Sequence, residues 1–233
     1  MIKNIIYLIN VNNGSYATHT YPLIEEYAKK VNADIAVFDT EIFESTSLPH
    51  PNFLIFEILK HFKTTDYARM MYIDMDIRIL PQSPNIFEEF KGFAMVEDHK
   101  ADLWRRDAMN DFLKYYFPEL ECKHYFNGGV MIADHDSVEK LLTVIPDDYI
   151  NFWRQHPDGK LKSINQTLLN LFILQSNIEY SVMPDMYNKV CRKATASDYF
   201  IHYVANKNQI QTEFDKFKDN ICNESITMTL ENL

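Results

Sequence analysis

The segment Met70-Met71-Tyr72-Ile73-Asp74-Met75-Asp76-Ile77-Arg78-Ile79-Leu80-Pro81 contains two acidic residues in an otherwise apolar run. Residues 70–73 have the composition of a buried strand. Side chains alternate along a strand, so Asp74 and Asp76 are predicted to lie on one side. Two neighbouring carboxylates repel each other unless a positive charge lies between them. The segment therefore predicts a divalent metal site, typical of a metal-assisted reaction on a phosphate-bearing substrate.

The composition is that of a globular protein without a nucleic-acid surface. The 233 residues are 46% hydrophobic and 14% aromatic, with no repeat or linker, and predict a single domain over 1–233 with 205–233 as a C-terminal extension. The net charge of -10 argues against a general nucleic-acid partner. The three cysteines lack motif spacing and indicate reduced thiols.

The start of the chain enters an apolar strand directly, without the pattern of a signal peptide. No apolar stretch approaches the roughly 18 residues of a membrane span. We therefore expect no transmembrane segment and a cytoplasmic protein. The sequence does not predict an oligomeric state.

The order of predicted elements indicates an α/β fold. A strand at 3–11, a turn, a helix at 20–31 and a strand at 34–38 form the opening of a nucleotide-binding Rossmann-like domain. Hydrophobic spacing predicts further helices at 53–62, 107–116, 136–144 and 163–174, the third capped by Asp136 or Ser137 and the fourth by Ser163. Further strands are predicted at 70–73, 93–96, 180–182 and 200–204. Residues 125–133 are predicted to form a turn followed by a strand.

Two other segments have residues suited to ligand binding. The sequence has five glycines, against roughly 16 expected from average usage, and Gly128 and Gly129 are adjacent. With Asn127 they predict a turn before a strand, where the backbone can approach a ligand and the amide can bind hydroxyls. His202 lies in an apolar strand, five residues before Lys207, and the two offer a metal-ligand nitrogen and a phosphate-binding cation.

In order and content these motifs resemble the GT-A fold glycosyltransferases, especially the glycogenin and galactinol synthase group and small viral or bacterial sugar transferases. The resemblance spans residues 1 to about 207. It is carried by four segments: Tyr72-Ile73-Asp74-Met75-Asp76, Phe126-Asn127-Gly128-Gly129-Val130-Met131, Asn165-Gln166-Thr167-Leu168-Leu169-Asn170, and His202-Tyr203 with Lys207. It implies a mixed central sheet flanked by helices.

The resemblance also implies roles for individual residues. Asp74, Asp76 and His202 are expected to bind Mn²⁺ (or Mg²⁺), which holds the diphosphate of a nucleotide sugar, with UDP favoured as the nucleotide. Gln166, Asp98 and Asn127 are the expected catalytic residues, with Gln166 near the anomeric carbon and Asp98 binding the donor sugar. The remaining residues expected to contact the donor are Ile9, Asn10, Asn12, Tyr16, Lys60, Met75, Gly128, Gly129 and Lys207.

The chain departs from the family pattern at three places. Asn165 replaces an acidic partner of Gln166, which bears on the retaining mechanism. Phe56 occupies a position that is often basic, so Lys60 is the expected substitute. The usual glycine after His202-Tyr203 is missing.

The implied reaction is transfer of a sugar from a nucleoside diphosphate to a hydroxyl of a glycan or other acceptor, with retention of configuration favoured. The alternatives are an inverting transferase with Asp98 or Asp134 as base, a phosphatase with an aspartyl nucleophile, and a non-catalytic nucleotide-sugar-binding module. The phosphatase motif normally lies on the first strand. We interpret Trp104-Arg105-Arg106 as an exposed start of a helix, although it could face the acceptor.

Overall fold

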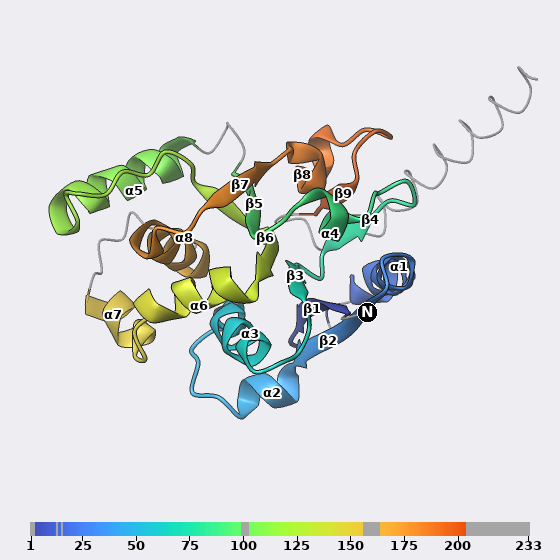
Figure 1. Ribbon diagram of the computed structural model, residues 1–233, viewed down its shortest axis with the longest axis horizontal. Coiled ribbons are helices and arrows are strands. Elements are labelled where there is room, and N and C mark those ends of the chain that lie inside the picture. The colour runs from blue at the N-terminus through green and yellow to red at the C-terminus, as the bar shows by residue number, and fades with distance from the viewer. Residues whose placement is uncertain (1–2, 13, 15, 99–102, 156–163, 204–233) are drawn as a thin grey trace, which may run out of the picture.

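The structure is a computed structural model that describes residues 3–12, 14, 16–98, 103–155 and 164–203. Its centre is a mixed sheet of six strands in the order β2-β1-β3-β6-β5-β7 (Figure 1). The strands are β1 (Asn4–Asn10), β2 (Ala33–Asp39), β3 (Arg69–Ile73), β5 (Phe93–Glu97), β6 (Phe126–Asp134) and β7 (Tyr180–Met183). β6 runs antiparallel to both of its neighbours, β3 and β5, whereas β2, β1 and β3 are parallel, as are β5 and β7.

Both faces of this sheet are covered, because side chains alternate along each buried strand. One face packs against α3 (Leu54–Lys63), α6 (His135–Val144) and α8 (Ile164–Ser176), and the other packs against α1 (Ala17–Lys30) and α4 (Ile86–Glu89). In β3, Met70 and Tyr72 face the first layer, while Met71 and Ile73 face the second. Figure 1 shows the two layers on opposite sides of the sheet. The predicted α/β fold with a mixed, helix-flanked sheet is thus confirmed.

A second sheet of three short strands lies beside the end of β3. It has the order β4 (Ile77–Ile79), β9 (Phe200–His202) and β8 (Lys189–Val190), and β4 pairs antiparallel with β9 so that Ile77 is opposite His202. β4 follows β3 after a three-residue connection. The pairing brings the late histidine next to the two early aspartates.

The described part of the chain also has further helices and 3₁₀ turns. They are α2 (Thr40–Glu44), the 3₁₀ turn η1 (Pro51–Phe53), α5 (Leu103–Tyr116), α7 (Tyr149–Gln155) and the 3₁₀ turns η3 (Asp185–Tyr187) and η4 (Cys191–Lys193). None of the helices in the described part of the chain has the length and apolarity that crossing a membrane requires.

Three local predictions were wrong. Asp74 and Asp76 lie in the connection between β3 and β4 rather than on a strand, and the Ile77 N–H donates to the Asp74 carbonyl at 3.1 Å. Asn127, Gly128 and Gly129 lie within β6, at the irregularity where its register with β5 shifts between Met95 and Glu97. Helix α6 is capped by Asp134, whose Oδ1 accepts from the Ser137 N–H. Ser163 and the 205–233 segment lie outside the described residues.

Candidate active site

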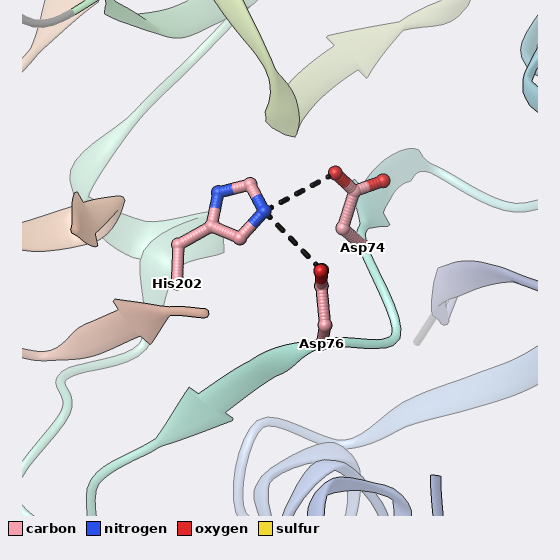
Figure 2. Close-up of side chains that lie close together, drawn as sticks. All are labelled: Asp74, Asp76 and His202. Atoms are coloured by element: carbon pink, nitrogen blue, oxygen red, sulfur yellow. Dashed lines mark ion pairs between the residues drawn. The ribbon is translucent and has the colours of Figure 1, made fainter. Parts of the chain in front are cut away.

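Asp74, Asp76 and His202 converge where the two sheets meet (Figure 2). The Nε2 atom of His202 is 3.5 Å from Oδ2 of Asp74 and 3.2 Å from Oδ1 of Asp76. Asp76 and His202 are buried, and Asp74 is half-buried. The two aspartates therefore point to one place although they do not share a strand.

Backbone hydrogen bonds fix the connection that carries these aspartates. The Asp74 N–H donates to the Gly129 carbonyl at 2.8 Å, and the Tyr203 N–H donates to the Asp76 carbonyl at 3.1 Å. From helix α1, the buried Thr20 hydroxyl donates to the Met75 carbonyl at 2.5 Å. The connection is thus tied to β6, β9 and α1 together.

Tyr72 adds a side-chain contact from β3. Its hydroxyl donates to Oδ1 of Asp74 at 2.5 Å. Burial raises the pKa of Tyr72 well above its usual value, and the negative charge of Asp74 raises it further. The phenol therefore stays protonated and orients one carboxylate oxygen, while the other faces His202.

The donor set fits a divalent cation. Two carboxylates and one imidazole, with ligand atoms all within 4.8 Å of one another, combine hard oxygens with a nitrogen, as Mn²⁺ and Mg²⁺ sites do. Neighbouring ligands of an octahedral ion with bonds of about 2.1 Å lie about 3 Å apart, close to the observed N–O separations. Two adjacent carboxylates also need a cation to offset their repulsion.

The two adjacent glycines differ in what they make room for. A Cβ atom on Gly129 would lie 2.7 Å from Cε1 of His202 and 3.0 Å from Oδ1 of Asn127. A Cβ atom on Gly128 would lie at an ordinary 3.7 Å from Oε1 of Gln166. At Gly129 the backbone lies close to the His202 side chain, whereas the predicted approach to a ligand stays a prediction.

A second cluster of polar side chains, centred on Asp98, lies beside the three candidate metal ligands. The carboxylate of Asp98 accepts from Arg105 at 2.6 Å, from Gln166 at 3.0 Å and from Asn127 at 3.4 Å. Gln166, in the first turn of α8, also accepts from the Gly128 N–H at 3.0 Å. The three expected catalytic residues, Gln166, Asp98 and Asn127, are thus joined in one network.

These groups surround a cavity of about 420 Å³. The residues that line it are Ile9, Val11, Tyr16, His50, Pro51, Asn52, Tyr72, Asp74, Met75, Asp76, Arg105, Asn127, Gly128, Asn165, Gln166 and His202. Asp98 contributes to a neighbouring cavity of about 410 Å³. Asn127 lines both cavities, and its Nδ2 donates to Asp98 in the second one.

Several expected residues lie elsewhere. Lys60 is 2.9 Å from Glu57 and lies over the ring of Tyr149, and it lines a different cavity, beside β2. Asn10 and Asn12 do not line the main cavity, and the Asn12 N–H donates to the Thr40 hydroxyl. Lys207 lies outside the described residues.

Asp134 is also remote from the site. Its carboxylate caps α6 at the far end of β6, five residues and about 17 Å along the strand from Gly129. It is therefore excluded as the base of an inverting reaction.

The sequence alone did not reveal the position of Arg105. We expected it on an exposed helix start, yet its guanidinium lies on the cavity wall and pairs with Asp98. Two features of the sequence could have indicated this position. The helix that carries Arg105 follows soon after β5, and a basic residue was needed in place of the one that Phe56 replaces. Phe56 is fully buried in the core.

Comparison with protein families decides what class of protein has this site. Residues 15–208 match the family described as Glycosyl transferase family 8. The chain belongs to this family. It is a glycosyltransferase, whose substrates are a nucleotide-sugar donor and an acceptor, and members of the family generally use a divalent metal. Comparison with curated protein sequences gives no match.

Solved structures with the same fold include three glycosyltransferases. One is involved in the glycosylation of the major capsid of PBCV-1 (TM-score 0.58, 12% identity, 90% of this chain and 99% of that one). The others are mouse xyloside xylosyltransferase 1 in its apo form (0.59, 11%, 89% and 99%) and galactosyltransferase LgtC with donor and acceptor sugar analogues (0.57, 11%, 90% and 94%). The likeness establishes the GT-A fold of this family 8 enzyme.

Proposed function

We propose that this enzyme transfers a sugar from a nucleoside diphosphate sugar, with UDP favoured, to a hydroxyl of a glycan or other acceptor. The observation that carries the proposal is the convergence of Asp74, Asp76 and His202 beside a cavity lined by Arg105 and Gln166. These three ligands would hold Mn²⁺ (or Mg²⁺). When bound, such an ion stabilises the charge that develops on a departing diphosphate.

The chain's own residues would bind the two ends of the donor. At one end, Ile9 and Tyr16 lie on the cavity wall at the carboxyl end of β1, where open α/β sheets bind nucleotides. At the other end, Arg105, Asn127 and Gln166 offer donors and acceptors for sugar hydroxyls. Lys207 remains a proposed phosphate contact.

The contacts of Asp98 favour retention of configuration. A general base for inversion must have an oxygen available for the acceptor proton. Here three side chains donate to the Asp98 carboxylate, so it is better suited to orienting Gln166 and Arg105 than to accepting a proton. Inversion with Asp98 as base is the second candidate, and the anomeric form of the product distinguishes the two.

The neighbouring cavity is a suitable place for the acceptor. It shares Asn127 with the donor cavity and is also lined by Glu97, Asp98, Asp185 and Asn188. Carboxylates and amides are hydrogen-bond acceptors and donors for hydroxyl groups. An acceptor there would reach the donor past Asn127, which lines both cavities.

The test is incubation of the protein with a panel of UDP-, GDP- and TDP-sugars, with Mn²⁺ or with a chelator. We expect Mn²⁺-dependent release of the nucleoside diphosphate from one donor class, with the sugar product read by proton NMR. Binding without release would instead support the non-catalytic binding module. Failure of every donor to bind or react with Mn²⁺ would overturn the proposed function.

A further inference from the structure

Asn188 lies between the His202 ring and Asn127, outside the set of metal ligands. It is 7% exposed and follows η3. Its Oδ1 is 2.7 Å from Nδ1 of His202, and its Nδ2 donates to Oδ1 of Asn127 at 2.7 Å. The Gly129 N–H donates to the same Oδ1 of Asn127 at 2.8 Å. A chain of hydrogen bonds thus runs from a backbone amide of β6 to the imidazole.

The direction of every hydrogen bond in this chain follows from its first member. A backbone N–H can only donate, so the Asn127 atom that Gly129 contacts must be the carbonyl oxygen. That oxygen must then receive a donor from Asn188, which is its amino group. The remaining atom of the Asn188 amide is therefore an oxygen, and it accepts only if Nδ1 of His202 carries a hydrogen.

This direction has a consequence at the other ring nitrogen. In a neutral imidazole with its hydrogen on Nδ1, Nε2 has a free lone pair. Nε2 is the atom that faces Asp74 and Asp76. Without the chain of amides, the two carboxylates would favour the opposite form, with the hydrogen on Nε2 and directed at them. That form has no lone pair to offer a metal.

We propose that Asn127 and Asn188 act as an amide relay that holds His202 with its hydrogen on Nδ1, so that Nε2 is kept as a metal ligand. The proposal rests on the metal site of the proposed function and adds two positioning residues to it. Gly129 starts the relay with its N–H and, by lacking a side chain, leaves room for the ring.

The first test reads the hydrogen directly in the metal-free protein. Nitrogen-15 NMR of histidine-labelled protein distinguishes the two neutral forms, and the His202 signals are identified by their loss in His202→Gln. We expect the hydrogen on Nδ1. A neutral His202 with its hydrogen on Nε2 would overturn the relay, and no variant has to fold for this result. Because no metal is present, the outcome is independent of the proposed function.

Variants then test whether the amides cause this preference. We expect Asn188→Leu to move the hydrogen to Nε2, and Asn127→Leu to do the same although Asn127 is not hydrogen-bonded to the ring. Asn85→Leu is the matched control: it removes an asparagine that also has one backbone and one side-chain partner, at the start of α4 and outside the relay, and should leave the His202 signals unchanged. If both relay variants keep the wild-type form, the relay is wrong.

The last readout is the affinity for Mn²⁺ alone, measured by electron paramagnetic resonance of the free ion without any sugar. Loss of an outer partner of a ligating histidine costs about 10- to 100-fold in metal affinity, and we expect such a loss in Asn188→Leu and not in the control Asn85→Leu. Equal affinity in Asn188→Leu and wild type would overturn the role of Asn188 in metal binding. Absence of Mn²⁺ binding in the wild type, with the hydrogen on Nδ1, would instead count against the proposed function.

Discussion

His202 reaches the aspartates because Gly129, the β6 residue against which its ring packs, has no side chain. The gap is filled by the imidazole itself, since an added Cβ on Gly129 would lie 2.7 Å from Cε1 and 2.9 Å from Nδ1 of the ring. Real Cβ atoms do not approach other atoms so closely. A rigid ring on a paired strand has little freedom to move away.

We therefore predict that Gly129→Ala displaces His202 and weakens Mn²⁺ binding at least 10-fold, with a stability loss of about 1–3 kcal/mol from overpacking. Gly128→Ala is the matched control, because its Cβ would make ordinary contacts of 3.7–3.8 Å with Gln166. Mn²⁺ titration and thermal unfolding of both variants are the measurements. Equal Mn²⁺ affinity in the two variants would contradict the prediction.

The residues of the metal site could be predicted from sequence, but the reason for their convergence could not. Period-two alternation placed Asp74 and Asp76 on one strand face, whereas they lie in a connection held by Thr20, Gly129 and Tyr203. Those contacts come from segments more than 50 residues away in the chain. Local periodicity contains no information about them.

The buried Asn170 side chain hydrogen-bonds helix α8 to the start of β6. Asn170 is 1% exposed, its Oδ1 accepts from the Phe126 N–H at 2.7 Å, and its Nδ2 donates to the carbonyls of Phe126 and Gln166 at 2.9 and 2.8 Å. Asn170 thus provides hydrogen-bond partners for the backbone N–H and C=O of Phe126 and also holds the turn of α8 that carries Gln166.

Asn170→Leu should cost about 2–4 kcal/mol, because it leaves the buried N–H and C=O of Phe126 unsatisfied, each at about 1–3 kcal/mol. Asn170→Asp should also be destabilising, because its second carboxylate oxygen would face the carbonyls of Phe126 and Gln166 without a hydrogen to donate. Urea unfolding measures both variants. A loss of unfolding free energy below about 0.5 kcal/mol in Asn170→Leu would show that the hydrogen bonds of Asn170 contribute little to stability.

Most strands and helices with clear hydrophobic patterning were predicted close to their observed bounds, including the short β7 and β9, whereas β4 and β8 were not predicted. The strands β1, β2, β3 and β5 and the helices α1 and α3 lie near the predicted ranges. β4 and β8 have three and two residues, and exist only through pairing with β9. That pairing joins Ile77 to His202, so no local pattern could reveal it. Helix α5 begins earlier than predicted, which is why Arg105 was misplaced.

The whole molecule has many buried groups that are neutral when folded. Burial raises the pKa of Cys122 from 9.0 to about 12 and that of Tyr125 from 10.0 to about 12. Burial also raises the pKa values of Tyr7, Tyr27 and Tyr149. All five favour the protonated form in the folded state.

Alkaline pH should therefore destabilise the protein. A group whose pKa is raised by folding contributes stability that is complete below its unfolded pKa and is lost as pH rises through its folded pKa. We expect the free energy of unfolding to fall between about pH 9 and pH 12, the range from the ordinary cysteine pKa to the raised values. Tyrosinate absorbance should appear together with loss of circular dichroism. Complete tyrosine ionisation near pH 10 in a folded protein would contradict this.

The proposed function depends on the candidate metal site at the junction of the two sheets. Calorimetric titration of wild type and Asp76→Asn with Mn²⁺ and a UDP-sugar tests it most directly. Asp66→Asn, which removes an exposed acid, is the charge control. Wild type and Asp66→Asn should bind the donor only with Mn²⁺, and Asp76→Asn should lose that binding at least 10-fold while folding as well as wild type. Donor binding that is independent of Mn²⁺, or unchanged in Asp76→Asn, would contradict the assignment of this site.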